Sequence, residues 1–171
     1  MAPPPRAHDP RLTTHDSFIR RLGPGDDALL ARLATEGPDF DLEGRDEPER
    51  SLTPAAAARY LANPAVLHWV AFAGERGDEP VGTLFCLHLP LPSGDGEEVL
   101  LHEIGVRRAW RRRGVGRALL AELTRWMRDH AVPEVWVLAD NPAATAFYAA
   151  CGFAVAAEQP TYLTRRAAPH A

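Results

Sequence analysis

Five arginines and two glycines stand close together in the middle of this chain, between residues 107 and 116. The last six of these residues read Arg-Arg-Arg-Gly-Val-Gly, and no acidic residue lies anywhere in the stretch. Glycine has no Cβ, so an anion can approach the backbone closely there. Free N–H groups at a helix start favour negative charge, and arginine side chains add charge-assisted hydrogen bonds. These residue types at this spacing therefore predict an anion-binding loop.

Two regular elements are expected to hold this loop. Val99–Val106 is a short apolar run bounded by polar turn residues, which predicts a buried strand. Beyond Gly114, apolar residues recur at spacings of three and four, which predicts an amphipathic helix whose buried face carries Val115, Leu119, Leu123 and Trp126. A strand that feeds a glycine-bearing turn and then a helix N-terminus is a frame suited to anion binding.

Two common phosphate-binding motifs are excluded by the same residues. The loop of nucleotide hydrolases requires a lysine, and this chain contains none. The dinucleotide fingerprint Gly-x-Gly-x-x-Gly lacks its third glycine, because Leu119 stands three residues after Gly116. What remains is Arg-x-x-Gly-x-Gly after an apolar strand, which resembles the acyl-coenzyme A pyrophosphate loop of the GCN5-related N-acetyltransferases (GNAT). The open alternative is a helix start beside a solvated run of charge.

A second motif extends the resemblance toward the C-terminus. Asn141 follows a predicted strand, Tyr148 stands seven residues later on a predicted short helix, and Gly152-Phe153 comes next. Members of the GNAT family commonly show these residues in this order. Taken alone, a tyrosine on a helix is more often half-buried packing than a functional group. Together the two motifs cover Val99–Phe153, about a third of the chain, and on them the chain is identified as a member of the GNAT family.

The resemblance implies an α/β (α+β) fold. The expected GNAT-type central sheet is mixed and mostly antiparallel, with about six to seven strands, a splayed V between the fourth and fifth, and about four helices on its faces. Outside the two motifs, strands are predicted at Ser17–Leu22, Val66–Ala73, Val81–Leu89, Glu134–Ala139, Phe153–Ala157 and Thr161–Arg165. Further helices are predicted after the N-caps Asp26 and Thr53 and over Pro142–Cys151.

In this family the strand before the loop carries a bulge and splays from the next strand. The resemblance therefore implies that acetyl-CoA, the co-substrate, binds along the open strand edge while loop amides surround its pyrophosphate. The expected residues of this site are Ile104, Gly105, Val106, Arg111, Arg112, Arg113, Gly114, Val115, Gly116, Arg117, Asn141 and Tyr148. Tyr148 is also expected beside the thioester sulfur, as the general acid that protonates the departing thiolate.

The implied reaction also needs a base. An alkylamine with a pKa near 10 must lose a proton before it attacks, at a cost of about 4 kcal/mol at neutral pH, and a positioned base contributes about 10²–10⁴-fold. Glu103 is the best candidate, because it is a lone carboxylate in an otherwise apolar strand, just before the expected acetyl-binding backbone. The alternative for Glu103 is a paired structural charge. His102 is expected on the opposite face of the strand, because side chains alternate.

The sequence leaves several possibilities for the amine that accepts the acetyl group. His102–Val106 before the arginines, and Tyr60–Pro64 before the predicted hairpin, are similar to the small aminoglycoside 3-N-acetyltransferases, which carry an acidic residue at the place of Glu103. The acidic stretch Asp39–Glu49 would suit a polycationic sugar. Asn141 departs from those enzymes, which tend to have aspartate there, and the C-terminal tail matches them poorly. Open alternatives are a peptide, protein or small-metabolite amine as acceptor, and a catalytically silent acyl-CoA-binding sensor.

Composition is that of an ordinary globular protein. The chain has 171 residues, of which 46% are hydrophobic and 25% charged, and its formal net charge is −4. We expect residues 1–15 to be a disordered tail and residues 16–171 a single acetyltransferase domain. The negative charge argues against a nucleic-acid partner, and the lack of a long apolar run argues against a membrane span.

Two further expectations concern metals and compartment. The seven histidines are scattered without metal-ligand spacing, so no metal is expected. The two cysteines, Cys86 and Cys151, fit a reducing compartment, and we expect a cytoplasmic protein. Because GNAT relatives frequently form dimers, a homodimer is left open as the assembly state, with no interface identified.

Overall fold

The computed structural model describes residues 18–40, 51–73, 78–92, 96–157, 161 and 163–165. The chain divides into two compact units, Met1–Leu138 and Ala139–Ala171, and each is described here by itself. The predicted tail (residues 1–15) and most of the acidic stretch (residues 41–49) lie outside the described residues. Within the described part, no helix is both long enough and apolar enough to cross a bilayer.

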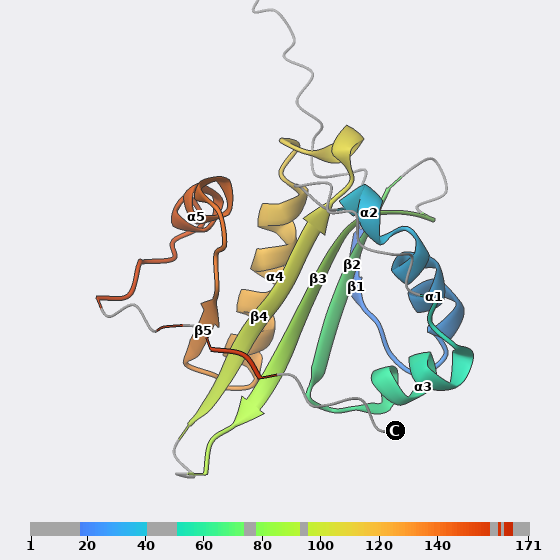
Figure 1. Cartoon of the computed structure of the whole chain (residues 1–171), viewed down its shortest axis with the longest axis horizontal. Helices are drawn as coiled ribbons and strands as arrows, with labels where there is room; N and C mark the ends of the chain where they lie inside the picture. The colour runs from blue at the N-terminus through green and yellow to red at the C-terminus, as the bar shows by residue number, and fades with distance from the viewer. Residues whose placement is uncertain are drawn as a thin grey trace, which may run out of the picture. The chain divides into compact units, whose positions relative to one another are not determined.

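The first unit is built on one sheet of five strands (Figure 1). Their order in the sheet follows their order in the chain: β1 (Phe18–Arg21), β2 (Val66–Ala73), β3 (Glu79–Pro90), β4 (Glu97–Val106) and β5 (Glu134–Val137). The first four strands pair antiparallel, whereas β5 lies parallel to β4. The prediction of a mixed, mostly antiparallel sheet is therefore confirmed, with a strand count somewhat smaller than expected.

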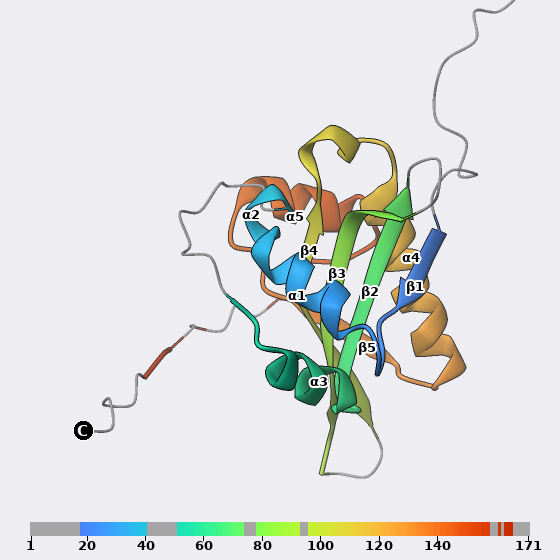
Figure 2. The same cartoon turned by 90° about the vertical axis from the view of Figure 1, so that its right-hand side faces the viewer.

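Helices cover both faces of this sheet (Figure 2). As a consequence, β2 is buried along its whole length and its sequence, VLHWVAFA, shows no polar–apolar alternation. On one face lies α4 (Val115–Asp129), which approaches β3 closely because Gly82 has no side chain; a Cβ there would stand 2.7 Å from Val115 Cγ1. The predicted amphipathic helix is confirmed, with Val115, Leu119 and Leu123 buried, whereas Trp126 is only half-buried.

The opposite face carries three helices: α1 (Asp27–Thr35), α2 (Gly37–Phe40) and α3 (Pro54–Ala62). Together with β2 they form an apolar core of Leu22, Leu30, Leu33, Phe40, Ala57, Leu61, Val70 and Phe72. The single turn α2 includes Asp39, the first residue of the acidic stretch. Its Phe40 packs directly over Gly105 of β4, since a Cβ at Gly105 would stand only 2.8 Å from Phe40 Cβ.

The two predicted N-caps of this face behave differently. Thr53 caps α3 as expected, with its Oγ1 accepting from the Ala56 N–H at 3.2 Å and Pro54 in the first turn. Asp26 precedes α1, but its side chain makes no capping hydrogen bond. Its carboxylate instead accepts from the Arg20 guanidinium at 2.7 and 2.8 Å and from the Gly23 N–H, because a charged partner on β1 lies within reach.

The second unit contains the helix α5 (Pro142–Ala149), which begins as predicted and ends two residues earlier than the predicted Cys151. Gly152 follows in a left-handed conformation, with a φ of 94°, as expected for a helix stop. The strand predicted at Phe153–Ala157 is wrong, because these residues are irregular. The described residues of the strand predicted at Thr161–Arg165 are irregular as well, which accounts for the lower strand count.

Candidate active site

The turn between β4 and α4 leaves the helix N-terminus open. Its N-cap is Gly114, with a φ of 88° and no side-chain cap, and the first turn of α4 contains no acidic residue. The N–H groups of the first helical residues therefore have no acceptor within the helix. Arg112 is also left-handed, with a φ of 61°, and turns that contain such residues direct successive N–H groups into an anion-binding concavity. This local geometry is compatible with the predicted anion-binding loop.

The arginines of this segment divide into two groups. Arg107 is turned toward the protein: its Nε donates to the Pro80 carbonyl at 2.6 Å, its guanidinium pairs with Glu36, and it lies 5.0 Å from the Phe40 ring centroid. Arg107 therefore joins α2 to the sheet, and its guanidinium is engaged in contacts within the protein. Arg111 stabilises the turn through a hydrogen bond from its Nε to the Val106 carbonyl at 2.9 Å.

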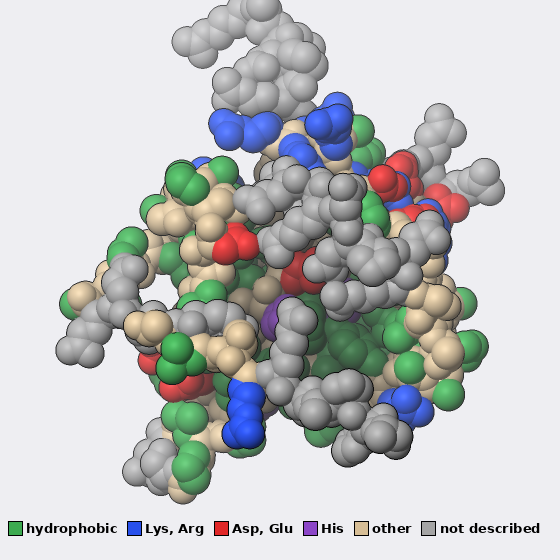
Figure 3. Space-filling view, in the orientation of Figure 1, with side chains coloured by type: hydrophobic (Ala, Val, Ile, Leu, Met, Phe, Trp, Pro, Cys, Tyr) green, Lys and Arg blue, Asp and Glu red, His purple; other side chains and the backbone are tan. Residues whose placement is uncertain are grey.

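The arginines that remain near the helix start are Arg112, Arg113 and Arg117, all of them exposed. Arg113 extends over the indole of Trp110, with 5.3 Å from its guanidinium carbon to the ring centroid. Basic side chains gather over the connection between β4 and α4, at the upper edge of the molecule in Figure 3. Positive charge and free amides thus coincide at one helix start.

The strand β4 separates from β5 halfway along its length. Their parallel ladder runs from the pair Glu98–Glu134 to the pair Leu101–Val137, whereas β4 continues to Val106. Within the described residues, the second half of β4 has a strand neighbour on the β3 side only. Ile104 and Val106, the expected contacts of the acyl-CoA arm, lie in this half, where the Val106 carbonyl accepts the hydrogen bond from Arg111 Nε. The predicted splay between the fourth and fifth strands is present.

A bulge interrupts the other edge of β4 at the same level. Cys86 of β3 faces Leu101, the next residue Phe85 faces Glu103, and His102 is the extra residue between them. The prediction that His102 points to the face opposite Glu103 is wrong, because a bulge places two successive residues against one partner. The His102 ring instead lies 5.1 Å from the ring of Phe85, the residue that Glu103 faces.

Glu103 is exposed and lies beside a hydrogen-bonded polar chain whose central residue, His68, is buried. The hydroxyl of Tyr60, on α3, is 3.0 Å from His68 Nδ1, and His68 Nε2 is 2.7 Å from Thr83 Oγ1. Burial lowers the pKa of His68 to about 4, so its ring is neutral at pH 7. Burial and then the charge of Glu103 raise the pKa of Tyr60. Sequence reasoning passed over His68, although a histidine in the apolar run of β2 was a usable signal.

The burial of His68 predicts that the stability of the protein depends on pH. The unfolded protein takes up a proton on His68 with a pKa near 6.5, whereas the native protein resists it down to about 4. The free energy of unfolding should therefore fall as the pH drops from 6.5 to 4, by about 3 kcal/mol at most from this group. Denaturant titrations at several pH values measure the slope. His68→Gln should flatten it in this window, and an unchanged slope would contradict the assignment.

The two candidate residues of the second unit have local roles there. Asn141 caps α5, with its Oδ1 accepting from the Ala144 N–H at 2.8 Å, and its Nδ2 donates to Asp140 Oδ1 at 3.0 Å. Tyr148 is buried, with its ring 5.3 Å from the rings of both Phe147 and Phe153. Asn141 and Tyr148 therefore contribute to the local structure of the second unit.

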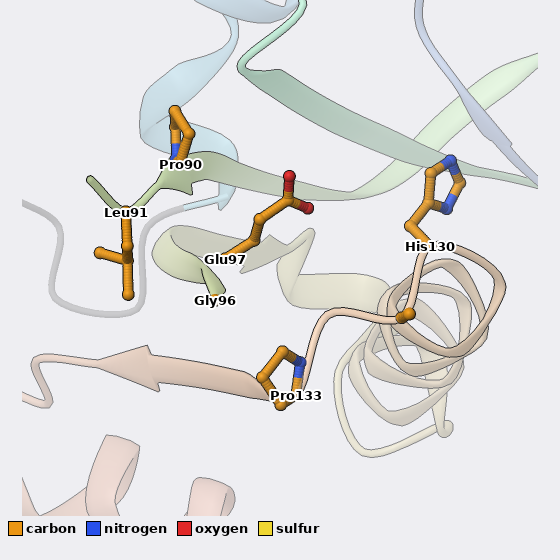
Figure 4. A pocket seen from close by; sticks show the side chains of 7 residues that line it. Pro90, Leu91, Gly96, Glu97, His130 and Pro133 are labelled. Atoms are coloured by element: carbon orange, nitrogen blue, oxygen red, sulfur yellow. The ribbon is translucent and has the colours of Figure 1, made fainter. Parts of the chain in front are cut away.

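An open depression of about 600 Å³ lies at the other end of β4, far along the strand from the arginine turn (Figure 4). It is lined by Pro90, Leu91, Gly96, Glu97, His130, Ala131 and Pro133. None of the candidate site residues lies in it. Among the residues that the structure describes, no three His, Cys, Asp or Glu side chains are grouped so that they could hold a metal ion.

Comparison with known proteins places this geometry in a family. The model of the acetyltransferase (GNAT) family matches residues 34–153, more than half of the chain. The chain belongs to the GNAT family. Its activity is accordingly that of an N-acetyltransferase, and members of this family generally use acetyl-CoA. None of the curated proteins matches this acetyltransferase significantly.

Solved structures with the same fold include enzymes of two acceptor types. An aminoglycoside acetyltransferase from an uncultured soil metagenomic sample, in complex with trehalose, has 18% identity, a TM-score of 0.75, and coverage of 90% of this chain and 98% of its own. A second, also from an uncultured soil metagenomic sample, has 26% identity, a TM-score of 0.71, and coverage of 89% and 99%. The ribosomal-protein-alanine N-acetyltransferase of Brucella melitensis biovar Abortus 2308 has 19% identity, a TM-score of 0.66, and coverage of 88% and 99%.

Proposed function

We propose that this acetyltransferase transfers the acetyl group of acetyl-CoA to a primary amine by direct attack within a ternary complex. The observation that carries the proposal is the second half of β4, which has no strand neighbour on the β5 side beyond Leu101 and is followed, after the turn of residues 107–114, by the uncapped N-terminus of α4. An open edge suits the amide-bearing arm of coenzyme A. A helix start with free amides and exposed arginines suits its pyrophosphate.

In the proposed reaction, Glu103 accepts a proton from the ammonium form of the acceptor, directly or through a water molecule. The free amine then attacks the thioester carbonyl, so that a C–N bond forms, the C–S bond breaks and the nitrogen loses its second proton to solvent. Tyr148 donates a proton to the departing thiolate and regains one from solvent. Glu103 is exposed at the bulge, beside the open half of β4, which supports its role as the base.

We propose an aminoglycoside as the acceptor, acetylated at its 3-amino group in the cytoplasm, which would confer resistance to the antibiotic. Glu103 and the net charge of −4 suit a polycationic sugar. Two of the structural relatives are aminoglycoside acetyltransferases, and one of them has been crystallised with sisomicin. A peptide, protein or small-metabolite amine is the alternative acceptor, and a protein acceptor is supported by the ribosomal-protein-alanine N-acetyltransferase among the structural relatives.

Thiol release from acetyl-CoA, measured on purified protein against a panel of amines, tests this function. The panel contains sisomicin, spermidine, free amino acids and an alanine-starting peptide, with a reaction lacking amine as the blank. We expect rapid thiol release with sisomicin and a mass increase of one acetyl group on the product. Turnover only on the peptide or on an amino acid would reject the aminoglycoside acceptor. Calorimetric binding of acetyl-CoA without thiol release on any amine would indicate a silent acyl-CoA-binding sensor instead.

A further inference from the structure

Three aromatic rings from three different elements lie close together near Glu103, which is paired with Phe85 in the sheet. The ring of Phe85, on β3, lies 5.5 Å from the ring of Tyr60, on α3, and 5.1 Å from the ring of His102, on β4. Phe85 is also the residue that faces Glu103 across the ladder. The bulge therefore brings one carboxylate and three rings to the same face of the sheet.

These rings are accessible and are held at an angle to one another. The Tyr60 and Phe85 planes are tilted by 53°, and those of Phe85 and His102 by 43°, so none of the rings is stacked flat against its neighbour. Tyr60 and Phe85 are half-buried and His102 is exposed. Figure 3 shows this face hollowed over β2 and β3, with hydrophobic side chains at the bottom and acidic and histidine side chains at its edge.

The Tyr60 ring is held in position by hydrogen bonds to residues of the sheet beneath it. Its hydroxyl is joined through His68 to Thr83, and the His68 side chain is only 8% exposed. A neutral histidine that bridges two hydroxyls fixes both partners without adding a positive charge. The buried part of the cluster therefore leaves the negative charge of Glu103 uncompensated.

We propose that Tyr60, Phe85 and His102 form an aromatic wall of the acceptor subsite, which binds a primary ammonium group carried on a saturated carbon frame next to Glu103. The faces of aromatic rings attract cations, and the carboxylate adds a direct charge. The carbon frame packs against the rings while the nitrogen points to Glu103. Tyr60 is a specificity-determining residue of this site, and His68 is a positioning residue that acts through it. The inference rests on the proposed function, since it places the amine that Glu103 deprotonates.

A ligand titration by NMR tests the wall without requiring turnover. The probes are cyclohexylammonium chloride and its neutral isostere cyclohexanol, and the readout is the aromatic signals of Tyr60, Phe85 and His102. We expect cyclohexylammonium to shift all three rings saturably and cyclohexanol to shift them far less. Tyr60→Leu, which keeps apolar volume but removes the ring, should weaken cyclohexylammonium binding about fivefold. Tyr60→Phe, which keeps the ring, should weaken it less.

Phe18→Ala is the matched control, because Phe18 is an exposed aromatic residue of the same sheet, stacked on Phe72 away from Glu103. It should leave the titration unchanged. Equal shifts with cyclohexanol, no shift of the three rings, or wild-type affinity in Tyr60→Leu would each overturn the proposal. Because the titration needs no acetyl transfer, these outcomes are distinct from a failure of the thiol-release assay, which would instead reject the proposed function.

Discussion

Glu103→Gln is expected to lower kcat for acetyl transfer about 10²–10⁴-fold at neutral pH while leaving the Kd of acetyl-CoA nearly unchanged. The substitution keeps the size and shape of the side chain but removes the carboxylate that accepts the proton of the amine. Because Glu103 is exposed at the bulge rather than buried in an ion pair, its replacement should not unfold the protein. Thiol-release kinetics at saturating amine measure kcat, and calorimetry measures the binding of acetyl-CoA.

A control for this variant lies on the same strand. Glu97 begins β4 at the opposite end, where it is exposed and pairs with His88 at 2.8 Å. Glu97→Gln removes the same charge from the chain but should leave kcat within about twofold of the wild-type value. Equal losses in the two variants would show a general effect of net charge. An unchanged kcat in Glu103→Gln would remove this residue from the role of the base.

The double variant Arg112→Gln/Arg113→Gln should raise the Kd of acetyl-CoA about 10–100-fold, with a smaller effect on kcat. Each arginine is exposed beside the uncapped start of α4, and an exposed charge pair is worth at most about 1 kcal/mol, so the two arginines together account for about 2 kcal/mol, or roughly 30-fold in Kd. The effect should shrink as salt is added, because exposed charges are screened. Calorimetric titration of acetyl-CoA at low and high ionic strength measures both quantities.

Arg125→Gln provides the comparison on the same helix. Arg125 is exposed near the C-terminal end of α4 and is paired with Glu122 at 2.7 Å, away from the helix start. Its replacement should leave the Kd of acetyl-CoA unchanged. The prediction is wrong if the double variant at Arg112 and Arg113 binds acetyl-CoA as tightly as the wild type. In that case the backbone amides of the turn alone would bind the pyrophosphate.

Local patterns in the sequence were sufficient to predict the frame of the site. The apolar run before the arginines became β4, the three- and four-residue spacing became α4, and Gly114 occupies the left-handed position that begins the helix. Thr53 also caps its helix as predicted. These features depend on neighbours within a few residues, so a single sequence carries the information.

The tertiary structure alone decided which way several side chains point. Arg107 belongs to the same basic run as Arg111, yet it pairs with Glu36, a residue far away in the sequence. His102 lies beside Phe85 because β3 and β4 pair with a bulge, and strict alternation along the strand could not predict this. Asp26 pairs with Arg20 of β1 instead of capping its helix. In each case, the charge or ring that decides the orientation is contributed by another element, and only folding brings the two together.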